Sequence, residues 1–172
     1  MSQIKNYQTS KLYQFTAIDT FSRLRILEGY LEQSTYTAWL LLVQVLSFYK
    51  AHGIEVKMVQ TDNGPIFTNR FLTTNNDKLT LFEQELKKRH IRYKTIKTYT
   101  PKHNGKVERS HREDQRRLYS EMIRLDQLLT DIGSFKQRLK AHQKRSNSRG
   151  MRPLSYLSPL EFLQIYFWLH GR

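Results

Sequence analysis

Two acidic residues stand out because of the residues around them. Asp62 follows an apolar segment and precedes Asn63-Gly64, and Glu108 lies within the basic segment 101–109. Carboxylates from distant segments of a chain can bind divalent cations together, and nearby Lys and Arg side chains can bind phosphate. The pattern predicts metal-assisted chemistry on a phosphate backbone, with Asp62 and Glu108 as the catalytic and metal-binding residues.

Each of these carboxylates also has an ordinary interpretation. Asp62 could be a solvated residue in a turn that the following glycine permits. Glu108 could pair with Arg112, one helical turn later, on an exposed helix face. The spacing of His103 and His111 matches no zinc motif, so we interpret them as surface histidines. These alternatives stay open on the sequence alone.

The chain is strongly basic, with 29 Lys and Arg against 15 Asp and Glu and a net charge of +14. Such a charge predicts a polyanionic partner, with nucleic acid as the first candidate and an anionic membrane surface as the second. The basic residues are concentrated in segments 97–117 and 134–149. Two such segments favour phosphate contact over solvated faces, and binding of this kind depends steeply on salt.

Composition excludes several classes of protein. The chain has no Cys, so it has neither a disulfide framework nor a Cys-based zinc site. The first ten residues are polar and do not resemble a signal peptide, and the longest apolar stretch, 38–46, is too short to cross a bilayer. We therefore expect a cytoplasmic, DNA-associated protein of bacterial type that does not use a membrane.

The elements that would position the acidic residues follow from the hydrophobic pattern. Strands are predicted at 12–18, 25–31, 56–60 and 91–96, and helices at 35–52, 80–89, 106–125 and 135–147, with a short apolar helix after Ser158-Pro159. Gly133 is expected to interrupt the helical pattern. Strands alternating with helices, followed by helices alone, predict an α/β core at 1–126 and a helical C-terminal extension of the same domain at 127–172.

Taken together, these segments resemble the integrase core of insertion-sequence DDE transposases, which are related to retroviral integrases. The resemblance rests on residues 16–23, 60–67, 100–109 and 151–163, and it covers about residues 12–166 in order. It implies a ribonuclease-H-like fold, in which a mixed five-stranded sheet is flanked by helices. It also implies the cleavage and transfer of DNA strands in transposition or integration.

The resemblance implies two Mg²⁺ or Mn²⁺ ions, about 4 Å apart, that assist an in-line displacement at phosphorus. No covalent protein–DNA intermediate is needed. Asp62 would be the second aspartate of the family, and Glu108 would be its glutamate. The partner would be DNA, as transposon ends and as target.

DNA-binding residues are predicted on two grounds. By the resemblance, Asn104 matches a polar position that contacts DNA, and Lys106, Arg109 and Arg112 would position the backbone. By charge alone, three further residues are predicted to contact phosphate, namely Arg116, Lys140 and Lys144.

The beginning of the chain departs from the family pattern. The family's first aspartate lies on an earlier strand, in a motif like Trp-x-x-Asp-x-Thr, whereas residues 1–10 here contain no acidic residue. We therefore expect a chain that is truncated at its amino terminus and lacks the central first strand of the sheet. Asp19 is predicted to cap a turn and to bond Ser22 or Arg23, rather than to bind metal.

Two functions are compatible with this sequence. The first is a transposase core that cleaves and transfers DNA strands with two divalent metal ions and is incomplete in this chain. The second is a non-catalytic DNA-binding or oligomerisation module, either an inhibitor-like fragment or a remnant. Such a module would associate with itself or with a full-length transposase.

Overall fold

The computed structural model describes residues 11–70, 78–96, 105–120 and 131–170. Within these residues the strands pair two by two. β1 (Tyr13–Ile18) and β2 (Arg25–Tyr30) are antiparallel, whereas β3 (Met58–Thr61) and β4 (Arg92–Thr95) are parallel. No strand in the described ranges joins one pair to the other. The expected loss of the central first strand concerns residues 1–10, which lie outside the described residues.

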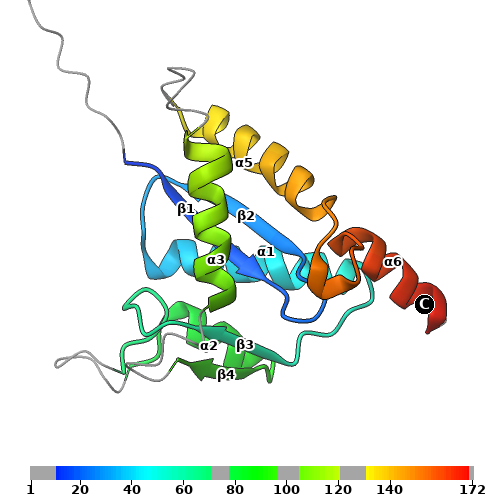
Figure 1. The fold of residues 1–172 in the computed structure, drawn as a ribbon. Coiled ribbons are helices and arrows are strands. Elements are labelled where there is room, and N and C mark those ends of the chain that lie inside the picture. The colour runs from blue at the N-terminus through cyan, green and yellow to red at the C-terminus, as the bar shows by residue number, and fades with distance from the viewer. Residues whose placement is uncertain (1–10, 71–77, 97–104, 121–130, 171–172) are drawn as a thin grey trace, which may run out of the picture.

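Helices flank both pairs of strands (Figure 1). The α-helices are α1 (Thr35–Ala51), α2 (Leu81–Lys88), α3 (Gly105–Asp114), α5 (Ile132–Asn147) and α6 (Pro159–Leu169). A π-helical segment, η2 (Gln115–Tyr119), continues α3, and a 3₁₀ turn, η3 (Arg152–Leu154), precedes α6. The predicted elements agree with these to within a few residues, and the end of the helix predicted at 106–125 lies outside the described residues.

One predicted boundary was wrong. Gly133 does not interrupt a helix, because it lies in the first turn of α5. The helix can begin before this glycine because Asp131 caps it, with the Ser134 backbone N–H donating to Asp131 Oδ1 at 2.8 Å. A side-chain cap of this kind stabilises the first turn, which offsets the low helix propensity of glycine.

The β1–β2 pair separates two apolar cores, because its side chains alternate between its faces. Phe15 and Tyr30 pack with the buried side of α1, while Leu27 points the other way and packs with Phe135 and Leu139 of α5. Gly29 allows α5 to approach β2 closely, since a Cβ there would lie 2.6 Å from the Phe135 ring. In Figure 1, α3 crosses β1 and α5 runs along β2.

Side chains of α5 also occupy the outer edge of β2. Asn147 accepts from the Arg25 backbone N–H at 3.0 Å and donates to the Arg25 carbonyl at 2.8 Å. Gln143 accepts from the Leu27 backbone N–H at 2.7 Å. An open strand edge presents unpaired backbone groups, so these bonds both satisfy the edge and fix the position of α5.

Candidate functional site

Asp62 directly follows the last residue of β3, as predicted. The Gly64 backbone N–H donates to Asp62 Oδ1 at 2.9 Å, which closes a tight turn over the carboxylate. A Cβ on Gly64 would lie 2.9 Å from that oxygen, so a glycine suits this position. The carboxylate is exposed and lines a cavity of about 270 Å³ together with Gln33 and Phe67.

The segment after Asp62 is anchored to α2. Thr80 caps α2 and its hydroxyl donates to the Phe67 carbonyl at 2.9 Å. The Thr68 hydroxyl donates to Glu83 at 2.8 Å, and both side chains are buried. The rings of Phe67 and Phe82 meet edge to face, with 5.2 Å between centroids. These contacts hold the turn that carries Asp62 against the core.

Tyr93 of β4 supports the same end of β3 from the side. Its hydroxyl lies 2.7 Å from Thr61 Oγ1, and the Thr61 hydroxyl in turn donates to the Asp62 carbonyl at 2.8 Å. Burial is the main cause that raises the pKa of Tyr93 to about 12. The phenol therefore keeps its proton at neutral pH and can donate it to Thr61.

Glu108 lies in the first turn of α3, as predicted, where the helix dipole favours a negative charge. Its side chain is exposed and is not paired with Arg112, although the structure describes both residues. The ordinary interpretation of Glu108 as half of that ion pair is therefore not supported. Figure 1 shows the first turn of α3 directed toward the side of the molecule with β3 and β4.

The chemistry of Asp62 and Glu108 fits Mg²⁺ or Mn²⁺, since both ions prefer oxygen ligands. Among the described residues, no group of three or more His, Cys, Asp or Glu side chains comes together as a metal site. Mg²⁺ commonly binds through one or two carboxylates, with water and substrate phosphate completing its shell. An ion held by Asp62 and Glu108 would be bound in this way, through two carboxylates.

Asp19 has a structural role, as predicted. Its Oδ2 accepts from the Ser22 backbone N–H at 2.8 Å and from the Ser22 hydroxyl at 2.6 Å. Its backbone carbonyl accepts from the Arg23 N–H at 3.0 Å. Both the side chain and the backbone of Asp19 thus close the turn between β1 and β2.

The predicted DNA-binding residues that the structure describes lie on α3, on its continuation η2 and on α5. Arg109 and Arg112 of α3 are exposed, as is Arg116 of η2, and Lys140 and Lys144 are exposed on α5. Asn104 and the side chain of Lys106 lie outside the described residues. No helix in the described ranges is long and apolar enough to cross a membrane.

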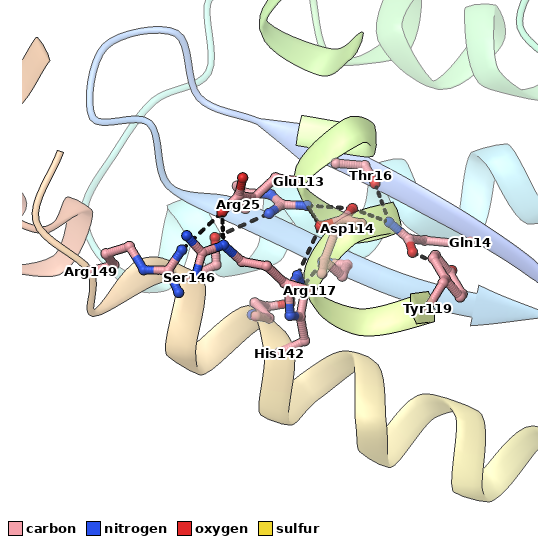
Figure 2. Close-up of polar contacts among 12 residues, drawn as sticks. Gln14, Thr16, Arg25, Glu113, Asp114, Arg117, Tyr119, His142, Ser146 and Arg149 are labelled. Carbon is pink, nitrogen blue, oxygen red and sulfur yellow. Dashed lines mark hydrogen bonds and ion pairs between the residues drawn. The ribbon is translucent and has the colours of Figure 1, made fainter. Parts of the chain in front are cut away.

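Sequence reasoning missed a buried polar cluster between β1, β2, α3 and α5, shown in Figure 2. Arg25 Nη2 lies 2.7 Å from both carboxylate oxygens of Asp114, and the two side chains are only 4% and 1% exposed. His142 Nε2 lies 2.9 Å from Asp114 Oδ1, and Gln14 donates to Asp114 Oδ2 at 2.7 Å. The sequence signal that could have indicated this cluster was Arg25 at the start of an apolar strand, because a buried charge needs a partner.

Burial alone would raise the pKa of Asp114. Hydrogen bonds from His142 and Arg25, together with the charge of Arg25, outweigh burial and hold the pKa of Asp114 below its ordinary value. The carboxylate is therefore ionised at neutral pH. It joins α3 to β2 and α5, and this fixes the direction of the helix that carries Glu108.

Comparison with known proteins finds similarity to integrases. No protein-family model matches the chain. A curated protein of Spiroplasma virus SpV1-C74, named "Putative integrase ORF3", is 28% identical over 159 residues, which cover 89% of this chain and 42% of that protein. The chain thus spans less than half the length of this relative.

Solved integrase structures share the fold. The catalytic core domain of BIV integrase has a TM-score of 0.62 and 23% identity, covering 91% of this chain and 89% of its own. The HTLV-2 integrase catalytic core domain in complex with magnesium, in a trimeric form, has a TM-score of 0.63 and 20% identity, covering 91% and 87%. A chain of the simian T-cell lymphotropic virus intasome, in complex with PP2A regulatory subunit B56 gamma, has a TM-score of 0.68 and 18% identity, covering 91% and 49%.

At these identities the solved structures establish the fold, and the viral relative adds similarity along most of the chain. Both findings confirm the resemblance that the motifs indicated. The chain has the ribonuclease-H-like fold of integrase catalytic core domains, and its sequence is similar to that of a protein named as an integrase.

Proposed function

We propose that this chain is the core of a DNA transposition or integration protein, in which Asp62 and Glu108 hold a divalent metal ion. The observation that carries the proposal is the position of Asp62. It directly follows β3 at the carboxyl edge of a parallel pair, where α/β proteins commonly bind ligands, and it is exposed in a turn anchored to α2. The similarity to integrases supports the same chemistry.

Each part of the site has a role in this proposal. The Gly64 N–H orients the Asp62 carboxylate, and the start of α3 stabilises the charge of Glu108. Arg109 and Arg112, exposed on the same helix, hold the DNA backbone on either side of the reacting phosphate. Bound Mg²⁺ or Mn²⁺ supplies activation of a water or a DNA 3′-hydroxyl and stabilisation of the leaving oxygen.

The test is nicking of supercoiled plasmid DNA with Mg²⁺ or Mn²⁺ as the added ion. Asp62→Asn and Glu108→Gln keep side-chain size and remove the charge, so each should reduce nicking to the level seen without metal. Glu55→Gln, which changes an exposed acidic residue elsewhere, is the matched control and should keep full activity. Metal-dependent nicking that persists in Asp62→Asn would refute the assignment.

A non-catalytic DNA-binding or oligomerisation module is the second candidate. One observation favours it: the Asp19 carboxylate accepts the bonds that close its own turn and so has a structural role. This function predicts DNA binding that survives Asp62→Asn and Glu108→Gln but weakens when Lys140, Lys144 and Arg145 are neutralised. Sedimentation would test self-association, and DNA binding unchanged by the neutralisation would count against the module.

A further inference from the structure

A second cavity, of about 490 Å³, lies between α3–η2 and α5. Neither Asp62 nor Glu108 lines it, so it is distinct from the candidate metal site. Its charged and hydroxyl-bearing lining includes Glu113, Arg116, Arg117, Arg145, Ser146 and Arg149. Four arginines, two on η2, one on α5 and one just after α5, therefore line one cavity with a single glutamate among them.

The arginines are not neutralised by that glutamate. Glu113 is shared, because it forms ion pairs with both Arg117 and Arg149, the latter at 2.9 Å (Figure 2). One carboxylate can balance only one of these two charges. Within the part of the chain that the structure describes, Arg116 and Arg145 have no carboxylate partner. The cavity thus keeps a surplus of positive charge.

Buried contacts fix the residues at the base of this positively charged cavity. His142 lines the cavity and is fixed from behind by Asp114, which is itself held by Arg25. Ser146 Oγ accepts from Arg25 Nη1 at 3.1 Å, so the serine keeps its own proton for donation into the cavity. The π-helical η2 carries Arg116 and Arg117, and such segments are frequent at functional sites.

We propose that this cavity binds a phosphate group of a nucleic-acid backbone. Arg116 and Arg145 would be the principal ligands, since guanidinium groups match the oxygens of phosphate and bind them through paired hydrogen bonds. Ser146 adds a hydroxyl donor. A backbone phosphate fits better than a free anion because α5 also carries exposed Lys140 and Lys144, which add positive charge for neighbouring phosphates. The choice of DNA as the nucleic acid rests on the proposed function.

The experiment compares two charge-matched double variants of the full chain. Arg116→Gln with Arg145→Gln removes the two unpaired cavity cations, whereas Lys140→Gln with Lys144→Gln removes two cations of α5 outside the cavity. A third pair, Lys50→Gln with Lys87→Gln, changes exposed residues on α1 and α2. Binding of a fluorescein-labelled DNA duplex is measured by anisotropy across a salt series, and binding of inorganic pyrophosphate is followed by NMR.

The cavity pair should lose about tenfold or more in DNA affinity at moderate salt, and its salt slope should fall by about 2. It should also lose pyrophosphate binding, which the Lys140 and Lys144 pair should retain. The α1 and α2 pair should behave like the unmodified chain. Replacing both arginines by lysine, which keeps the charge but not the forked geometry, should restore the salt slope and only part of the affinity.

Equal losses of DNA affinity in the cavity pair and the Lys140–Lys144 pair, with pyrophosphate binding intact in both, would overturn the site. Lost pyrophosphate binding with unchanged DNA affinity would overturn the nucleic-acid assignment. If the unmodified chain bound pyrophosphate in the cavity but no DNA, the proposed function itself would fail along with the assignment of DNA. Thermal unfolding of each variant separates loss of binding from loss of the fold.

Discussion

Replacing Asp114 with alanine should cost the domain a large share of its stability. The carboxylate is 1% exposed, and it holds Arg25, which is 4% exposed, at 2.7 Å. His142 and Gln14 also bond to it, at 2.9 and 2.7 Å. Without the carboxylate, the Arg25 guanidinium would remain buried and unpaired.

Removing one partner from a buried ion pair costs about 3–5 kcal/mol. Domains of ordinary stability unfold with only about 5–15 kcal/mol, so the variant should lose about a fifth or more of its folding free energy. Arg25→Met combined with Asp114→Leu removes both charges together. That double variant should lose less stability than Asp114→Ala, because no buried charge is left without a partner.

Urea denaturation followed by circular dichroism measures these differences. Glu113→Ala is the matched control, since Glu113 is the neighbouring acidic residue and its ion pairs are on the surface. Surface ion pairs contribute about 0–1 kcal/mol, so the control should change the unfolding free energy little. Equal losses in Asp114→Ala and Glu113→Ala would refute the argument that the buried pair joins α3 to β2.

Other residues give shorter predictions. The folded state lowers the pKa of Asp114, so the stability that its charge contributes is complete above the unfolded pKa of about 4 and is lost as pH falls through the lowered pKa. On acidification, the unfolding free energy should therefore fall less steeply in Asp114→Asn than in the unmodified chain. Equal slopes in the two proteins would contradict this. Gly29→Ala places a Cβ 2.6 Å from the Phe135 ring and should cost about 1–3 kcal/mol in urea unfolding. Gly53→Ala is the comparison, because its Cβ would have no atom within 4 Å while its φ is positive, so it tests backbone strain without a steric clash. Thr80→Ala removes the cap of α2 and the bond to Phe67 and should cost about 1–2 kcal/mol in urea unfolding. A loss below about 0.5 kcal/mol, the usual range of surface substitutions, would show that the cap is unimportant.

Much of the fold was predictable because its signals are local. Ser34, Thr80 and Ser158 cap the helices that follow them, and each forms a capping box with the residue three positions later. Such bonds depend on neighbouring residues in the sequence. The positions of Asp62 at the end of a strand and Glu108 in the first turn of a helix followed from the same kind of signal.

The parts that were not predicted depend on distant contacts. Arg25 and Asp114 are separated by 89 residues in the sequence, and no local pattern pairs them. The cavity between η2 and α5 arises only when Gly29 and Leu27 bring α5 onto β2. The sequence showed two basic segments, whereas the structure shows which of their arginines share one hollow.

The most direct test of the proposed function is Mn²⁺ binding measured by electron paramagnetic resonance, with and without a DNA duplex. Asp62 and Glu108 together are expected to hold the ion, with DNA phosphate adding ligands, so DNA should strengthen Mn²⁺ binding to the unmodified chain. Asp62→Asn and Glu108→Gln should each weaken it strongly, while Glu55→Gln should not. Mn²⁺ binding that is the same in all four proteins would contradict the proposed metal site.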